Sequence, residues 1–222
     1  MTTSKLECLD RRRSSRDLPL ATPQKSGQSR LIDASALKMH DDLVPRRTCG
    51  ECSACCELFA INTSELQKAQ DVLCPHCIRP AGCGIYPTRP PICHEWHCGW
   101  RRLPSLDCRW RPDRCGVLVE AMGIVPSLTG VNFIIMGGPE VIGWPPLVEY
   151  AADLVAVGVP VFLSAHGKLG SVLGTMGLND RLISAAQSCD TQRLRRELAT
   201  ARDACLAYPG LAKSEEGVPA PP

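Results

Sequence analysis

The sequence predicts an α+β fold in which a small, irregular, cysteine-rich core packs with a short-stranded sheet and C-terminal helices. Three observations predict it. Of the 222 residues, 14 are cysteines, and nine of these lie between residues 49 and 98. Short β-branched runs typical of strands follow the cysteines, and apolar residues then recur at helical spacing near the C-terminal end. Strands and helices are too few for a doubly wound sheet.

The overall composition is that of a folded chain with nearly balanced charge. The chain has 25 Lys and Arg residues and 23 Asp and Glu residues, which gives a net charge of +2, and 44% of its residues are apolar. These values exclude a wholly disordered chain, a strongly basic nucleic-acid binder and an acidic tail protein. Only 5% of the residues are aromatic, so the core must be built from Leu, Val, Ile and Ala.

The cysteines indicate metal ligation in a reducing compartment rather than disulfides in an oxidising one. Residues 1–19 contain no apolar run that could form the core of a signal peptide. The longest apolar stretch, Leu154–Ala165, is too short to cross a membrane and contains Gly158 and Pro160. We therefore expect a cytoplasmic protein that binds neither membranes nor nucleic acid. Its oligomeric state and a protein partner stay open.

Composition divides the chain into four segments. They are a disordered basic tail at 1–47, a cysteine-rich zinc- or iron-chelating domain at 48–120, an α+β region at 121–209 and a flexible tail at 210–222. In the first tail, a short helix is expected near Asp33–Asp41. In the second segment, the polar residues Asn62–Glu65 precede apolar residues at helical spacing, from Leu66 to Leu73, and predict a capped helix.

Residues 116–209 carry the clearest periodic patterns. Strands are predicted at Gly116–Met122, Val131–Met136 and Val159–Ser164. Helices are predicted at Pro146–Val157 and Asp180–Ala207, and Asp190 is expected to divide the second by capping a new helix. Cys189 and Cys205 lie on this second helical stretch and are expected to be buried as small apolar residues.

The main motif is the run Cys49-Gly-Glu-Cys52-Ser-Ala-Cys55-Cys56. Two cysteines separated by two residues can turn both sulfurs onto one metal ion, and two such units overlap here. Adjacent Cys55 and Cys56 point in different directions, so these four thiols do not close one tetrahedron alone. The candidate ligands further along the chain are Cys74, Cys77, Cys83, Cys93 and Cys98. Nine thiols can supply two four-cysteine zinc sites, one four-iron cluster with spare ligands, or mixed sites that include His76, His94 or His97.

A second block extends this pattern. It runs from Gly82 to Cys93 and contains Ile85, Tyr86, Arg89 and Pro90 at fixed spacing. Together with Cys49–Cys56, it resembles the YkgJ-type CxxCxxCC cysteine-cluster family, over roughly residues 48–120. The resemblance implies chelation of zinc or iron, and a related motif in flagellin lysine methylases is linked to an iron–sulfur cluster.

Arg89 is expected to lie beside the metal-bound thiolates without being a ligand. Four thiolates around Zn²⁺ leave a net negative charge, which a neighbouring guanidinium offsets while it donates hydrogen bonds to sulfur. Pro90 and Pro91 keep the following backbone extended toward Cys93. An ordinary surface ion pair of Arg89 is the alternative.

The most economical function is a metal-binding cysteine cluster whose metal is structural. Zinc is favoured over iron because CxxC pairs recur at Cys49, Cys52 and Cys74, and because the ferredoxin spacing before the fourth cysteine is missing. One alternative is an iron–sulfur protein in electron transfer or radical chemistry. Another is a metal-assisted enzyme that acts on a protein partner. Whether the protein is an enzyme stays open.

Overall fold

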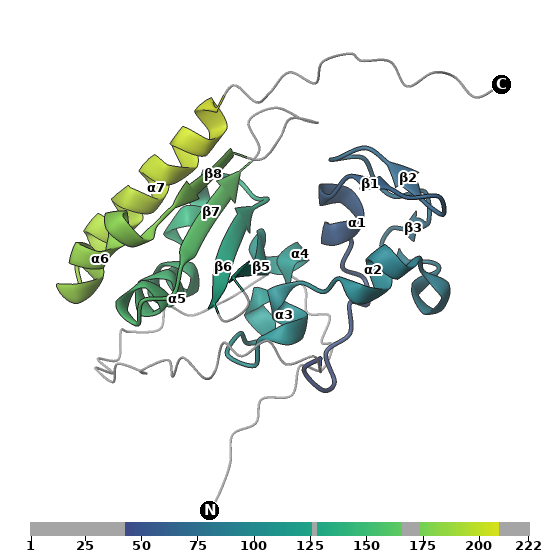
Figure 1. Ribbon diagram of the computed structural model, residues 1–222, viewed down its shortest axis with the longest axis horizontal. Coiled ribbons are helices and arrows are strands. Elements are labelled where there is room, and N and C mark those ends of the chain that lie inside the picture. Colours follow the sequence, from purple (N-terminus) through teal and green to yellow (C-terminus); the bar gives the residue numbers. More distant parts are fainter. Residues whose placement is uncertain (1–42, 126–127, 166–173, 209–222) are drawn as a thin grey trace, which may run out of the picture. The chain divides into compact units, whose positions relative to one another are not determined.

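The computed structural model describes residues 43–125, 128–165 and 174–208, all of which belong to one compact unit (Figure 1). The predicted tail at 210–222, most of the predicted tail at 1–47 and the helix expected near Asp33–Asp41 lie outside the described residues. The described part contains both helices and strands, so the predicted α+β class is confirmed.

A four-stranded mixed sheet forms the centre of this unit. Its strands, in spatial order, are β5 (Val117–Val125), β6 (Leu128–Ile135), β7 (Val161–Ala165) and β8 (Gly174–Gly177). The pairs β5–β6 and β7–β8 are antiparallel, whereas β6 and β7 are parallel. The three predicted strands are confirmed, and β8 is an addition. Its sequence, Gly-Thr-Met-Gly, lacks the β-branched run that would have predicted it.

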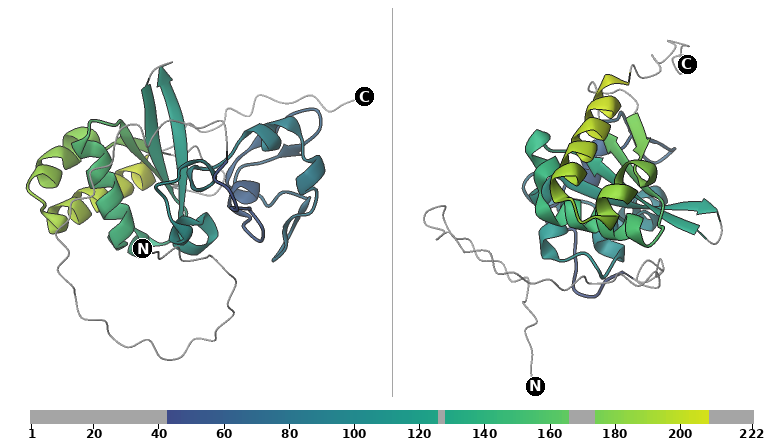
Figure 2. Two further views of the ribbon diagram at one scale, coloured as in Figure 1. Left: turned by 90° about the horizontal axis from the view of Figure 1, so that it is seen from below. Right: turned by 90° about the vertical axis from the view of Figure 1, so that its left-hand side faces the viewer.

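Three helices cover one face of the sheet, and the cysteine-rich segment lies toward the other (Figures 1 and 2). They are α5 (Pro145–Ala156), which connects the parallel strands, α6 (Asn179–Gln187) and α7 (Thr191–Ala207). The predicted break in the last helical stretch is confirmed, because the Asp190 side chain accepts a hydrogen bond from the Arg193 backbone N–H at 2.9 Å.

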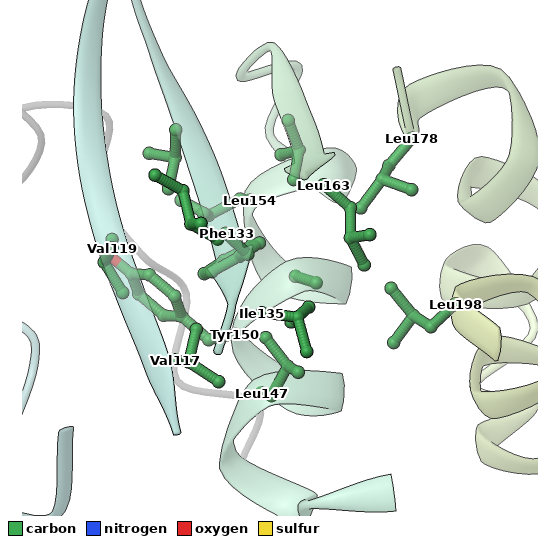
Figure 3. Packing of buried hydrophobic residues seen from close by; sticks show 14 of the residues in the cluster. Val117, Val119, Phe133, Ile135, Leu147, Tyr150, Leu154, Leu163, Leu178 and Leu198 are labelled. Atoms are coloured by element: carbon green, nitrogen blue, oxygen red, sulfur yellow. The ribbon is translucent and has the colours of Figure 1, made fainter. Parts of the chain in front are cut away.

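Side chains alternate between the two faces of each strand, and the apolar side chains on one face form the core between the sheet and these helices. Val119, Phe133 and Leu163 lie on one face and are almost fully buried. They meet Tyr150 of α5 and Leu198 of α7 (Figure 3). The opposite face of β5 presents Leu118 and Glu120, which face the cysteine-rich segment.

The cysteine-rich segment consists of short elements. Its helices are α1 (Ala54–Leu58), α2 (Pro91–Glu95), α3 (Gly99–Arg102) and α4 (Pro112–Cys115), and its strands form the hairpins β1 (Ile61–Asn62) with β2 (Gln67–Lys68) and β3 (Cys77–Ile78) with β4 (Gly82–Cys83). Turns of 3-10 helix lie at Tyr86–Thr88, Cys108–Trp110 and, beyond this segment, Pro139–Gly143. Leu58, Cys98 and Trp100 join the segment to the main core.

The helix predicted from the Asn62–Glu65 cap is wrong, because these residues turn the β1–β2 hairpin. The Thr63 hydroxyl accepts a hydrogen bond from the Leu66 N–H at 3.1 Å, as a capping residue would. However, the Thr63 N–H also donates to the Leu66 carbonyl at 3.0 Å, which closes a hairpin. Val72, which would have continued the apolar stripe of a helix, is exposed. The capping signal is thus present, but no tertiary contact extends it into a helix.

The folded region begins before residue 48. The Val44 N–H donates to the Arg101 carbonyl at 2.8 Å, and the Arg47 guanidinium donates to the carbonyls of Trp100, Leu103 and Leu106. The last residues of the predicted tail are therefore attached to the fold.

Candidate functional site

Eight of the nine predicted ligands line one cavity of about 290 Å³. They are Cys49, Cys52, Cys55, Cys56, Cys74, Cys83, Cys93 and Cys98. Cys77 is absent from the lining, but its thiol bonds to that of Cys56. Four stretches of chain bring these residues together: the turn into α1, the loop before β3, β4, and the helices α2 and α3.

Two glycines allow the chain to bring these thiols close. Gly50 has a φ of +51°, which lets the Cys52 N–H donate to the Cys49 carbonyl at 2.9 Å in the tight turn that the sequence predicted. Gly82 has a φ of +85°, and a Cβ at this position would lie 2.0 Å from the Gly50 carbonyl oxygen. Only glycine therefore allows β4, and with it Cys83, to approach the Cys49–Cys52 turn.

The largest group of neighbouring thiols surrounds Cys56. The hydrogen bond with Cys55, together with burial, raises the Cys56 pKa well above its usual range. Burial also raises the pKa of Cys83 and of Cys93, and the nearby Cys56 and Cys74 add to both shifts. Burial and the neighbouring Cys56 raise the pKa of Cys77 to about 11. These six cysteines thus influence one another electrostatically.

Cys49, Cys52 and Cys98 form a second group. Burial raises the pKa of Cys98 to about 12, and Cys49 and Cys52 contribute to the shift. Burial likewise raises the pKa of Cys52 to about 11, to which Asp113 and Cys49 add. The Cys49–Cys56 run therefore contributes to both groups, as expected if its four thiols do not close one tetrahedron.

The thiols surround the cavity without converging on one point. Within residues 43–125, 128–165 and 174–208, no set of three or more His, Cys, Asp or Glu side chains is arranged so that it could hold a metal ion as it stands. All 13 cysteines of these residues are free thiols. Raised pKa values mean that six thiols of the cluster are protonated at neutral pH: Cys52, Cys56, Cys77, Cys83, Cys93 and Cys98.

Arg89 lies at the cavity wall beside His97. Its guanidinium stacks on the Tyr86 ring at 4.0 Å and hydrogen-bonds to His97 Nε2 at 3.2 Å. Its positive charge lowers the pKa of the Cys83 and Cys93 thiols against the larger effect of burial. Burial, Arg89 and Arg101 lower the pKa of His97, which keeps its ring neutral. Of the three histidines considered as mixed ligands, His97 lines the cavity and His76 and His94 do not.

Sequence reasoning missed three charged residues near the thiols. Lys68 is 8% exposed, and its ammonium group donates to the backbone carbonyls of Glu57, Phe59 and Ala69. Burial lowers its pKa, while Cys74 and Cys56 oppose the shift. Arg101 and Glu120 line the cavity itself. No local pattern distinguishes these three residues from surface charges, because the burial of Lys68 and Arg101 and the half-burial of Glu120 depend on tertiary packing.

Glu120 ends a row of hydrogen bonds that crosses the whole sheet. The Asn132 side-chain amide donates to Glu120 at 3.3 Å, and the Ser164 hydroxyl donates to the Asn132 amide oxygen at 3.0 Å. Ser164 and Thr175 share a hydrogen bond of 2.8 Å, which Thr175 donates if Ser164 donates to Asn132. The donors of β6, β7 and β8 then all point toward the carboxylate of Glu120 on β5, which lies at the cavity.

The remaining described cysteines lie away from the cavity. Cys205 is 1% exposed, as expected, and its thiol donates to the Leu163 carbonyl at 3.4 Å. The burial expected for Cys189 is wrong, because this residue is exposed in the turn between α6 and α7, at a φ of +53°. Cys108 and Cys115 are both half-buried, and neither lines the cavity. The Cys115 thiol donates a hydrogen bond to the Val117 carbonyl.

Comparisons of the chain with protein-family models, with curated proteins and with solved structures found no match. Among the described residues, no helix combines the length and the apolar character needed to cross a membrane.

Proposed function

We propose that the protein binds a metal through its cysteine cluster, that the metal is zinc rather than iron, and that it stabilises the cysteine-rich segment. The observation that carries this proposal is the gathering of eight cysteines from separate stretches of chain around one cavity. Thiolate is a preferred ligand of zinc and of iron–sulfur clusters. The resemblance to the CxxCxxCC family supports the same assignment.

Metal binding would require the buried, protonated thiols to ionise. Their raised pKa values mean that each ligand must lose a proton when the metal binds, so affinity would rise with pH. Arg89 and Lys68 lie close to the Cys56 group and would offset the negative charge of the bound thiolates.

The shortness of the helices and strands in this segment supports a structural role for the metal. The segment's strands are two residues long and its helices are four or five residues long. Elements this short are not stable by themselves. The free energy of metal binding would stabilise them, as it does in other small metal-binding domains.

An iron–sulfur cluster is the second candidate, and the cavity favours it. A single zinc ion enclosed by four thiolates needs no surrounding space, whereas the cysteines here line about 290 Å³. Zinc remains the first choice because the CxxC pairs at Cys49, Cys52 and Cys74 have zinc-ligand spacing and the ferredoxin spacing is missing.

The ligand assignment can be tested with one variant from each thiol group. Cys52→Ser and Cys83→Ser should each lower the metal bound per chain and the melting temperature, because each removes a thiolate. Cys189→Ser is the matched control, since this cysteine is exposed and distant from the cavity lining. If both cavity variants retain full metal and the melting temperature of the control, the assignment is wrong.

A further inference from the structure

We propose that the cysteine-lined cavity also binds a small organic anion, whose carboxylate or phosphate group pairs with Arg101 and whose apolar part contacts the aromatic wall. This inference rests on the proposed function with zinc as the metal, because a zinc ion enclosed by thiolates leaves the rest of the cavity open, whereas an iron–sulfur cluster would occupy it.

Arg101 is a buried cation without a counter-charge. Its residue is 6% exposed, and its Nε and Nη1 atoms are buried without a hydrogen-bond partner. In the part of the chain that the structure describes, its side chain forms no ion pair. A guanidinium stays protonated at every physiological pH, so the charge cannot be removed by titration. An unpaired buried charge is strongly unfavourable, and an anion is therefore expected beside it.

Apart from the metal-bound thiolates of the proposed function, the neighbouring groups do not supply that anion. Glu120 is the one carboxylate among the described residues of the lining. Its Oε2 accepts a hydrogen bond from Asn132, and neither of its oxygens lies within 4 Å of an Arg101 nitrogen. His97 is neutral and Arg89 is a cation. The Cys98 thiol accepts a hydrogen bond from the Arg101 backbone, not from its guanidinium. Arg89 also has a buried Nε without a partner, but its guanidinium bonds to His97 and stacks on Tyr86, whereas no such contact from the described residues holds the Arg101 guanidinium.

The rest of the wall fits the apolar part of a small molecule. Phe59 and Trp96 pack edge to face at 4.8 Å, and both line the cavity together with Trp100, Leu118 and Ile61. A few charged groups in a largely apolar wall, here Arg89, Arg101 and Glu120, are typical of small-molecule sites, where such groups fix the orientation of the ligand. A volume of about 290 Å³ admits a single aromatic ring with its anionic substituent.

Four probes test the proposal with the full-length, metal-containing protein. Benzoate and phenyl phosphate combine an apolar ring with an anion, benzamide has the shape of benzoate without its charge, and inorganic phosphate lacks the ring. We expect benzoate or phenyl phosphate to raise the melting temperature and to bind in calorimetry, and the one that binds more tightly identifies the anion. Benzamide and inorganic phosphate should bind at least about tenfold more weakly, since each lacks one of the two contacts.

Two variants assign the binding to Arg101. Arg101→Gln should weaken binding of the preferred anion at least about tenfold, because a charge-assisted hydrogen bond is lost. Arg102→Gln is the matched control and should bind normally, since Arg102 bonds to the Glu95 carbonyl and does not line the cavity. Without ligand, Arg101→Gln should melt no lower than the unmodified protein and should keep its metal.

The proposal is overturned if neither ring-bearing anion binds, if benzamide binds as well as benzoate, or if Arg101→Gln binds the anion normally. It is also overturned if Arg101→Gln loses metal, because Arg101 would then be the counter-charge of the metal–thiolate group. Metal content measured in the same samples separates these results from a failure of the metal assignment itself.

Discussion

Arg47 holds the start of the folded region against the loop that follows α3. Its guanidinium donates to the backbone carbonyls of Trp100, Leu103 and Leu106, with 3.0 Å to Leu103, and lies 5.5 Å from the centroid of the Trp100 ring. Replacing it with methionine would keep an apolar side chain near the tryptophan and remove all three hydrogen bonds. We predict that Arg47→Met destabilises the protein.

The size of the effect follows from the three carbonyls. A hydrogen bond from a charged donor contributes about 1 kcal/mol or more, so the three bonds of Arg47 amount to about 3 kcal/mol, although the Leu103 carbonyl keeps a second bond from the Leu106 N–H at 3.2 Å. In a protein of this size, each 1 kcal/mol changes the melting temperature by about 2–4 °C. The expected decrease is therefore about 6–12 °C. Lysine offers a single ammonium group in place of the planar fork, so Arg47→Lys should recover less than half of this loss.

Thermal unfolding followed by circular dichroism measures the effect. Arg46→Ala is the control, because the neighbouring Arg46 side chain is exposed and should shift the melting temperature by less than about 2 °C. A chain that begins at residue 43 should melt like the full-length protein, whereas one that begins at residue 48 should melt at or below the temperature of Arg47→Met, because it also loses the Val44 N–H bond to the Arg101 carbonyl. If Arg47→Met melts within about 2 °C of the Arg46 control, the reasoning from the three carbonyls is refuted.

Three further predictions concern the core, the sheet and the thiols. Leu198→Ala should lower the free energy of unfolding by about 3 kcal/mol in urea titrations, because Leu198 is fully buried. Val157→Ala, at an exposed position, should lower it by less than about 1 kcal/mol, and equal losses in the two variants would contradict the packing described. Ser164→Ala should lower the free energy of unfolding by about 1–2 kcal/mol without changing metal content, because it interrupts the row of hydrogen bonds across the sheet. An unchanged free energy of unfolding would mean that the row does not stabilise the fold. Burial raises the pKa of Cys52 to about 11 and of Cys98 to about 12, above the value of 9.0 for a free thiol, so the unfolded chain releases these protons first. The reduced, metal-free protein should therefore keep its full stability below about pH 9 and lose it as the pH rises through 11; urea titrations that give one free energy of unfolding at pH 8 and pH 10.5 would contradict this.

The sequence predicted those helices and strands in which the spacing of the apolar residues matches the face that is buried. The strands β5, β6 and β7 and the helices α5, α6 and α7 carry apolar residues at the period of the element, and Asp190 caps α7 as expected. Prediction failed where tertiary contacts decide. The Thr63 cap signal leads into a hairpin, and the glycine-flanked β8 becomes a strand because β7 is there to pair with it.

In the candidate site, too, local patterns predicted some residues, whereas tertiary contacts determine the others. Ligand spacing and the block around Cys83 predicted which cysteines gather, because these constraints are local or repeat along the chain. Lys68, Arg101 and Glu120 were not predicted, since a charged residue is buried only by segments that lie far away in sequence. The close approach of Gly82 to Gly50 was also beyond sequence patterns, although each glycine marks a turn.

Metal analysis of protein purified without oxygen tests the central proposal most directly. We predict colourless protein with stoichiometric zinc and no change in its absorption spectrum on reduction, because zinc is redox-inactive. Brown protein that contains iron and acid-labile sulfide, with little zinc, would contradict the choice of zinc and favour an iron–sulfur function. Protein that contains no metal, and takes up none when zinc or iron is supplied under reducing conditions, would contradict the proposal that this cysteine cluster binds metal.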